Sequence, residues 1–339
     1  LGISMAVEDE TAVYISTDCI DEEIVDEMQS MFREKGVIMH NAKFDLAMLE
    51  YHFNFEFPNI DDTMLMSYML NEVPGNHGLK QLAIKHTPYG DYEKPMYDFI
   101  DDYCRRNGFL KGDFTWDMIP FDLIQVYAAM DACVTYRIYQ VFEAELNKDP
   151  QIRRVYKNLL IPAMNFLKDV QDTGVPFDRK RLEISQNLME QDIQLAIEKL
   201  EKHQEVRNFQ EFQGKDFNPN STLQLRKLLF DFIGLKPTGK KTGTGAHSTD
   251  AEVLQELGEQ HEVPTLILDI RQKSKIKNTY LDKIIPQLDR DSHLRTNFNL
   301  HGTTSGRLSS SGKLNMQQIP RDNPIVKGCI KAKEGHQIV

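Results

Sequence analysis

The stretch VIMHNAKFD, residues 37–45, joins a short apolar segment to the start of a helix. Residues 37–39 are continuously apolar, which predicts a short buried strand, and apolar residues then recur at helical spacing over residues 41–52. Asn41 and Asp45 stand four residues apart and therefore lie on one face of that helix. A carboxylate in this position can bind a metal ion, but it can equally serve to stabilise the positive end of the helix.

Strands and helices alternate around this stretch. Residues 2–15 alternate apolar and polar side chains on both sides of a polar turn, which predicts a hairpin. Residues 87–120 are rich in aromatic side chains and predict a loop, and NKDP at residues 147–150 marks a boundary. Helices are predicted over residues 21–32, 41–52, 62–71, 78–86 and 122–146. Because strands are interleaved with helices, residues 1–150 are predicted to be an α/β unit.

A second carboxylate motif, YAAMD at residues 127–131, lies inside the last of these helices. Tyr127 and Asp131 share one face of the helix because they are four residues apart. Mg²⁺ prefers oxygen ligands, and in two-metal phosphoryl hydrolysis the ions activate water and stabilise the leaving oxygen. A tyrosine hydroxyl one helical turn from a ligand could orient that water. Either motif alone is more often structural, but the two together, in this order after a buried strand, favour a metal site.

Residues 151–290 are predicted to be almost wholly helical, with capping boxes at Ser221 and Thr249 and a mobile segment at residues 236–247. The basic segment RQKSKIKNTY, residues 271–280, places like charges four residues apart on a helix. Such charges repel by a few tenths of a kcal/mol unless an anion lies across them. A phosphate backbone would supply that anion, and the alternative is an ordinary solvated helix face.

Residues 291–304 return to strand-like spacing, and the stretch TTSGRLSSS, residues 303–311, follows. Its composition alone is typical of a flexible linker. Hydroxyl groups and glycine N–H groups also suit phosphates, and Arg307 suits acceptors on the minor-groove edge of a base pair. The residues by themselves leave both interpretations open.

The net charge of −11 hides a division between two parts of the chain. Residues 1–150 hold 11 Lys and Arg against 28 Asp and Glu (−17), whereas residues 151–339 hold 29 against 23 (+6). An acidic part suits metal ions and a basic part suits a phosphate backbone, although acidic surface can also serve only solubility. The 40% apolar content excludes a largely disordered chain, no apolar run is long enough to span a membrane, and the four scattered cysteines are expected to be reduced.

HNAKFD (residues 40–45) and YAAMDA (residues 127–132) resemble the second and third motifs of the DnaQ-like 3′–5′ exonucleases, which have an RNase H-like fold. The intervening DDTMLMSYMLN and HGLKQLA resemble the form found in family A DNA polymerases. The resemblance implies that Asp45 and Asp131 are catalytic metal ligands and that Tyr127 positions the attacking water. It also implies that Asn41 contacts DNA and that Asp62 is an auxiliary acidic residue of the site.

The Asp-x-Glu first motif of those exonucleases has no match in this sequence. That motif supplies two of the carboxylates that complete the metal pair. The two-metal site is therefore expected to be incomplete, and the chain by itself is expected to be an impaired exonuclease.

The later segments resemble the polymerase region of family A. LLIPAMNFLKDVQDTGVPFD (residues 159–178) resembles its start, residues 236–257 resemble the thumb tip, and RQKSKIKNTY resembles the thumb stretch that grips duplex product. TTSGRLSSS and LNMQQIP (residues 314–320) resemble the family's TATGRLSS and NLQNIP, which implies that Arg307 contacts the primer-terminal pair. The DNA contacts implied in these segments are Lys240, Lys241, Arg271, Lys275, Lys277, Arg307, Asn315 and Gln317.

The expected fold class is α/β: an RNase H-like 3′–5′ exonuclease domain at residues 1–150, a mainly helical polymerase thumb at 151–290, and the first strands of the palm at 291–339, ending before its catalytic Asp. The expected function is that of a fragment of a DNA-directed DNA polymerase with a proofreading exonuclease, unable to polymerise by itself. A free-standing 3′–5′ exonuclease with a helical nucleic-acid-binding domain and a non-catalytic DNA-binding module are the alternatives.

The resemblance also implies cofactors and partners. The cofactor would be Mg²⁺ or Mn²⁺, and the partners would be primer-template DNA and single-stranded 3′ ends, with dNTP bound by the full-length parent. We expect a monomer without a membrane segment, acting in a bacterial cytoplasm or, if virus-encoded, in the cytoplasm of the host.

Overall fold

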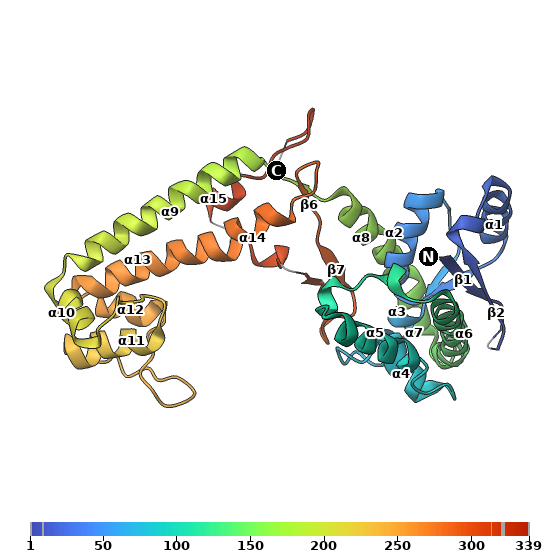
Figure 1. Cartoon of the computed structure of the whole chain (residues 1–339), viewed down its shortest axis with the longest axis horizontal. Coiled ribbons are helices and arrows are strands. Elements are labelled where there is room, and N and C mark those ends of the chain that lie inside the picture. The colour runs from blue at the N-terminus through green and yellow to red at the C-terminus, as the bar shows by residue number, and fades with distance from the viewer. Residues whose placement is uncertain (1, 9, 313, 320–322, 338–339) are drawn as a thin grey trace. The chain divides into compact units, whose positions relative to one another are not determined.

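The computed structural model describes residues 2–8, 10–312, 314–319 and 323–337. Its contacts divide the chain into two compact units (Figure 1). Unit 1 comprises Leu1–Thr173 and Asn297–Ser311, and unit 2 comprises Gly174–Thr296 and Gly312–Val339. Asp9 of the predicted polar turn, and Lys313 and Pro320 after the Ser-rich stretch, lie outside the described residues.

Unit 1 contains the predicted alternation of strands and helices. β1 (Gly2–Ala6) and β2 (Ala12–Ser16) form the predicted antiparallel hairpin. β3 (Val37–Met39), the predicted buried strand, pairs in parallel with β4 (Ile60–Asp62). The helices before residue 150 are α1 Glu22–Glu34, α2 Ala42–Phe53, α3 Thr63–Leu70, α4 Leu79–His86, α5 Lys94–Asn107 and α6 Phe121–Leu146, with single turns η1 Thr17–Cys19, η2 Lys111–Asp113 and η3 Trp116–Met118.

The prediction of a loop over residues 87–120 is wrong for its central part, where α5 lies. This helix places Met96 and Cys104 in the interior, where they are 1% and 5% exposed. Met96, Phe99, Ile100, Tyr103 and Cys104 recur at helical spacing, so the sequence does carry the amphipathic pattern of this helix. An aromatic-rich composition alone does not indicate a loop.

The core of unit 1 extends beyond the boundary expected at residue 150. α7 (Pro150–Val155), the π-helical turn η4 (Tyr156–Leu160) and α8 (Ile161–Thr173) follow α6 with little interruption. Tyr156, Leu160 and Met164 are buried in the same cluster as Ile138 of α6. Unit 1 therefore includes these helices. If it ended at residue 150, the apolar side chains of α7, η4 and α8 would lose their partners in the core and be exposed to water.

The antiparallel pair β7 (Asn297–Asn299) and β8 (Ser309–Ser311) also belongs to unit 1, although it was expected to lie with the residues around it in the palm segment. Leu300 packs against the unit 1 core. The Tyr68 hydroxyl donates a hydrogen bond of 2.8 Å to the Thr303 carbonyl. These contacts join residues more than 200 positions apart, so local sequence patterns could not reveal them.

Unit 2 is mainly helical, as predicted. Its two long helices, α9 (Arg179–Glu201) and α13 (Glu262–Ile276), pack side by side (Figure 1). β5 (Val175–Pro176) pairs antiparallel with β6 (His293–Leu294). The remaining elements are α10 Gln204–Gln213, α11 Thr222–Arg226, η5 Lys227–Phe232, α12 Ala251–Leu257, η6 Lys277–Leu281, α14 Asp282–Ile284, η7 Ile285–Gln287, η8 Met316–Gln318 and α15 Pro324–Lys327.

The helix caps follow the predicted positions closely. The Ser221 side chain accepts from the Gln224 N–H, as its capping box predicts. At the second box the cap is displaced by one residue, because Asp250 rather than Thr249 accepts from the Val253 N–H at 3.0 Å. The four cysteines, which all lie in the described part of the chain, form no disulfide with one another. None of the helices in the described residues has both the length and the apolarity to cross a membrane.

Candidate functional site

The start of α2 is held in place by the Asp62 carboxylate. Asn41 adopts a left-handed conformation with φ 62° at the N-cap, and the N–H groups of Asn41 and Ala42 donate to Asp62. The same carboxylate accepts from the N–H groups of Met64 and Leu65 at the start of α3. With four backbone donors and 2% exposure, Asp62 is a structural cap for two helices. The auxiliary acidic role that the resemblance implied stays a prediction, and the Asp62 charge acts on Asp45.

Asp45 on α2 and Asp131 on α6 face the same region of unit 1. Burial raises the pKa of Asp45 to about 7, and the charges of Asp62 and Asp131 add to this rise. Burial also raises the pKa of Asp131 to about 6, against hydrogen bonds from tyrosine hydroxyls that favour its charged form. The fold thus brings together two partly desolvated carboxylates from separate helices.

Two tyrosines contact Asp131. The predicted residue, Tyr127, lies one helical turn before it and hydrogen-bonds to it. The Tyr92 hydroxyl donates to Asp131 Oδ1 at 2.5 Å, and the two tyrosine rings stack with centroids 6.4 Å apart. Sequence reasoning missed Tyr92 because it stands in the segment that predicted a loop, far from Asp131 along the chain.

The carboxylate pair suits a hard divalent cation. Its oxygen atoms come from two separate elements, as a Mg²⁺ or Mn²⁺ site requires, and a cation would offset the repulsion that raises the pKa of Asp45. Among the described residues, no group of three or more His, Cys, Asp or Glu is arranged to hold a metal ion. Asp45 and Asp131 therefore fit as part of a ligand set.

A cavity of about 650 Å³ in unit 1 is lined by residues that interact electrostatically with Asp131. Its lining includes Glu93 and Tyr97, and the charge of Asp131 contributes to raising the pKa of Tyr97. Lys80 forms ion pairs with Asp91 and Glu93 at 3.2 and 3.6 Å, and its Nζ lies 5.5 Å from the centre of the Tyr97 ring. The cavity is therefore lined by the aromatic ring of Tyr97, the ammonium group of Lys80, and the backbone of Gly78 and Gly302, which have no side chains to cover it.

In the absence of metal, the Asp45→Asn variant is expected to be more stable than the parent chain at pH 8 by about 2 kcal/mol. The folded-state pKa of about 7 lies above the ordinary 3.8, so the stability contributed by the protonated carboxyl is complete below about pH 4 and is lost as the pH rises through 7. The full pKa shift corresponds to about 4 kcal/mol of unfolding free energy. We expect about half of this value, because Asp45 is partly exposed and solvent screens its charge.

Urea unfolding in EDTA at pH 4 and pH 8 measures this difference. Trp116, the single tryptophan, lies in unit 1 and reports its unfolding by fluorescence. Equal unfolding free energies of parent and variant at pH 8 would show that the charged Asp45 carboxylate does not destabilise the folded protein.

The lysine and arginine residues of unit 2 that were predicted to contact DNA differ in whether their charges are already bonded within the protein. Arg271 donates to the carbonyls of Pro219 and Thr249 at 2.7 and 2.9 Å. Lys277 pairs with Glu190 and Asp282, and Lys240 pairs with Asp250 and Glu252. Lys241 and Lys275 are exposed, and neither forms an ion pair with another described residue.

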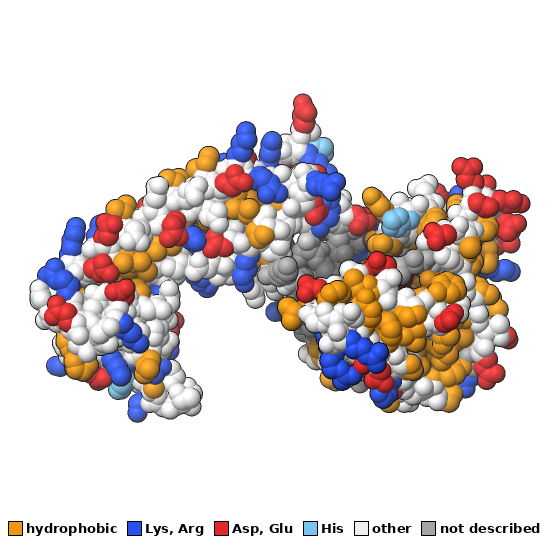
Figure 2. Space-filling model, viewed as in Figure 1, with side chains coloured by type: hydrophobic (Ala, Val, Ile, Leu, Met, Phe, Trp, Pro, Cys, Tyr) orange, Lys and Arg blue, Asp and Glu red, His pale blue; other side chains and the backbone are white. Residues whose placement is uncertain are grey.

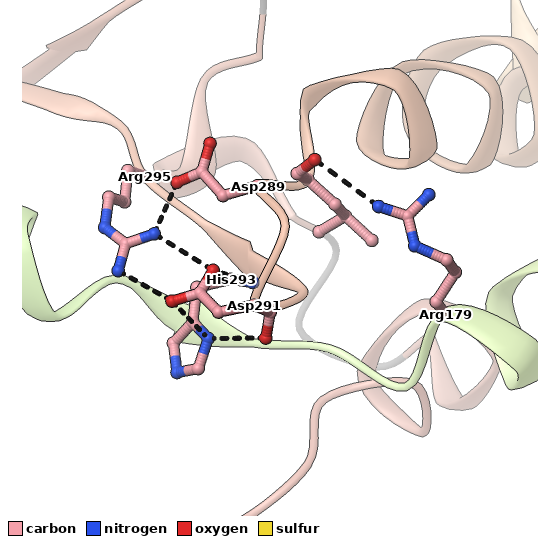
Figure 3. Close-up of polar contacts among 6 residues, drawn as sticks. Arg179, Asp289, Asp291, His293 and Arg295 are labelled. Carbon is pink, nitrogen blue, oxygen red and sulfur yellow. Dashed lines mark hydrogen bonds and ion pairs between the residues drawn. The ribbon is translucent and has the colours of Figure 1, made fainter.

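Figure 2 shows Lys and Arg side chains distributed over unit 2 among acidic ones, whereas acidic side chains gather over the part of unit 1 that holds α1. One further cation of unit 2 is neutralised locally. Arg295 contacts both Asp289 and Asp291, and Asp291 also contacts His293 (Figure 3). These contacts fix the turn before β6, so Arg295 is a structural residue.

The predicted contacts near the Ser-rich stretch lie in different units. Arg307, in unit 1, is exposed, and its carbonyl accepts from the Thr303 hydroxyl at 2.7 Å. Asn315 and Gln317 lie in unit 2, where the Asn315 side chain caps η8 by accepting from the Gln317 N–H. The exposure of Arg307 leaves its guanidinium accessible to a ligand.

Comparisons with known proteins match two successive parts of the chain to two families, and the second match includes residues 297–311, which belong to unit 1. Residues 1–147 match the family described as 3′-5′ exonuclease, and residues 185–339 match DNA polymerase family A. A DNA polymerase of Escherichia phage T5 is 43% identical over 100% of this chain, and DNA polymerase I of Rhizobium leguminosarum is 31% identical over 92% of it. The chain spans 41% and 29% of the lengths of these two relatives.

A solved structure confirms the fold class. The POL domain of Pol1 from M. smegmatis, in complex with a DNA primer-template and dNTP, matches with a TM-score of 0.74 at 22% identity. The match covers 97% of this chain and 52% of that one. At this identity the likeness establishes the fold and leaves the site residues to be argued from geometry.

Proposed function

The chain belongs to DNA polymerase family A and includes a 3′–5′ exonuclease domain, and on this premise we propose that it is part of a DNA-directed DNA polymerase that also removes nucleotides from 3′ ends. Unit 1 would bind single-stranded 3′ ends, and unit 2 would bind primed duplex together with Arg307 of unit 1. A free-standing exonuclease is less favoured, because residues 185–339 match the polymerase family and not a nuclease appendage.

The observation that carries the exonuclease proposal is the Asp45–Asp131 pair with the Tyr127 hydroxyl on Asp131. Asp45 and Asp131 would hold a divalent cation, which when bound supplies an activated water and stabilises the leaving oxygen. Tyr127 would orient the water, and Tyr92 holds Asp131 Oδ1. The cavity beside Glu93 and Tyr97 would take the terminal nucleotides, with Tyr97 as a stacking face.

We propose that the chain by itself hydrolyses 3′ ends slowly and does not polymerise. Two carboxylates provide fewer ligands than a pair of cations needs. The chain would act as a monomer in a bacterial cytoplasm, of either an uninfected or a phage-infected cell.

A direct assay tests the function. A 5′-labelled single strand, with its 3′ end free or blocked by a 3′-phosphate, is incubated with excess protein and Mg²⁺, Mn²⁺ or EDTA. We expect slow, metal-dependent shortening of the free 3′ end only. Shortening that persists in EDTA, or cleavage inside the strand with the blocked end, would contradict a metal-dependent 3′–5′ exonuclease.

The Lys275→Ala variant is expected to flatten the salt dependence of duplex binding by about one unit of log Kd per log salt, because an exposed lysine that meets a phosphate releases about one counterion. Lys277→Ala is expected to flatten it less, since Glu190 and Asp282 already neutralise that charge.

Fluorescence anisotropy of a labelled primed duplex at several salt concentrations measures both slopes. Lys85→Ala, an exposed lysine of unit 1, is the matched control. An unchanged slope for Lys275→Ala would show that Lys275 does not contact a phosphate and that this helix face is simply solvated.

A further inference from the structure

Lys43 makes contacts that the proposed function does not use. It lies on α2, two residues before Asp45, where a cation would ordinarily be expected to attract the phosphates of a bound strand. Instead, its ammonium donates to Gln171 Oε1 at 2.6 Å, to Asn297 Oδ1 at 2.7 Å and to the Phe298 carbonyl. A lysine ammonium has three donors, so all of them are occupied.

Two of the three receiving groups, Asn297 and Phe298, lie on β7 of the β7–β8 hairpin, residues 297–311, and the third, Gln171, lies on α8. Phe298 stands opposite Ser310 in the hairpin. Its N–H donates to Gln171 Oε1 at 2.7 Å, and its carbonyl accepts from Lys43. Side chains of α2 and α8 therefore bond both backbone groups of Phe298, on the side of β7 where the described part of the chain places no further strand.

The same hairpin carries Arg307 between its strands. Its loop is held at a second point, where the Tyr68 hydroxyl of α3 donates to the Thr303 carbonyl. Arg307 itself is exposed. The two points of attachment fix the base of the hairpin and the start of its loop to unit 1, while they leave the arginine accessible.

We propose that Lys43 is a positioning residue that fixes the hairpin bearing Arg307 to the helix bearing Asp45, so that a primer end bound by Arg307 and the metal carboxylates move as one body. The role of Arg307 in this statement rests on the proposed function. The attachment itself rests only on the contacts of Lys43, Gln171 and Phe298. Lys43 is thus assigned to the protein scaffold and not to the phosphates of the strand.

The Lys43→Met variant tests the attachment without DNA, because methionine retains most of the aliphatic length but has no donor. Hydrogen exchange of peptides covering residues 297–311 should become at least tenfold faster, while Trp116 fluorescence shows that unit 1 remains folded. Asn297→Ala, which leaves α2 untouched, should accelerate the same peptides to a smaller extent. Lys85→Met is the control for loss of an exposed charge. Unchanged exchange in Lys43→Met would overturn the proposal.

A double-mutant cycle tests the consequence for DNA. Lys43→Met should weaken binding of a primed duplex about fivefold in the parent background and have no effect in the Arg307→Ala background. Single-strand affinity and its salt slope should stay unchanged. A single-strand slope lower by about one would instead make Lys43 a direct phosphate contact and overturn the proposal.

The hydrogen-exchange experiment and the double-mutant cycle distinguish a failure of this proposal from a failure of the proposed function. If Arg307→Ala leaves duplex binding unchanged, the proposed role of Arg307 fails, and with it the DNA part of the inference. The hydrogen-exchange result then still decides whether Lys43 attaches the hairpin.

Discussion

Replacing Asp62 by alanine is expected to lower the free energy of unfolding of unit 1 by about 3–5 kcal/mol. The substitution removes the acceptor of four backbone N–H groups, at the starts of α2 and α3. Because Asp62 is 2% exposed, water cannot readily replace the lost acceptor. Each buried N–H left without a partner costs about 1–3 kcal/mol, and partial relaxation of the helix ends keeps the total below the simple sum.

Urea unfolding followed by Trp116 fluorescence measures this loss. Asp62→Asn should also destabilise unit 1. An amide has one acceptor oxygen, so it cannot accept from the N–H groups that both carboxylate oxygens now bind. Asp45→Asn is the informative control, because it removes a carboxyl from the same region and is expected to stabilise unit 1 at pH 8. If Asp62→Ala unfolded at the same urea concentration as the parent, the capping role of Asp62 would be refuted.

The contrast between Asp45 and Asp62 shows what the sequence could and could not predict. Helical spacing after an apolar strand was enough to predict α2 and to place Asp45 in its first turn, but Asn41 lies outside the helix as its N-cap, in a left-handed conformation that the spacing did not predict. The role of Asp62 depends on bonds to residues about twenty positions earlier. Local patterns carry no signal for such contacts, so a resemblance alone assigned it to the site.

The same reasoning explains the other differences. β4 is a strand of three residues, two of them acidic, and it exists because it can pair with β3. The β7–β8 hairpin belongs to unit 1 through contacts of Lys43 and Tyr68 with residues more than 200 positions away. Periodicity predicted the long elements, α6 and α9, whose amphipathic pattern is repeated over many turns.

Replacing Asp131 by alanine is expected to lower the metal-dependent shortening of 3′ ends by at least about a hundredfold. Loss of a ligand that holds the catalytic cation removes several kcal/mol of transition-state stabilisation, and each 1.4 kcal/mol corresponds to about a tenfold change in rate. Asp45→Ala should have a similar effect, because under the proposed function the two carboxylates hold the same cation. Their double variant should therefore be little slower than either single variant.

Single-turnover assays with excess protein, in Mn²⁺, resolve these differences even for a slow parent chain. Tyr127→Phe should fall between parent and Asp131→Ala, since its ring can still stack on Tyr92 while the hydroxyl that would orient the water is gone. Asp122→Ala, at the exposed start of the same helix, should leave the rate unchanged. Because Asp131→Ala also frees the Tyr92 hydroxyl, a folded variant that keeps the parent rate would remove Asp131 from the metal site and leave it as a structural partner of the two tyrosines.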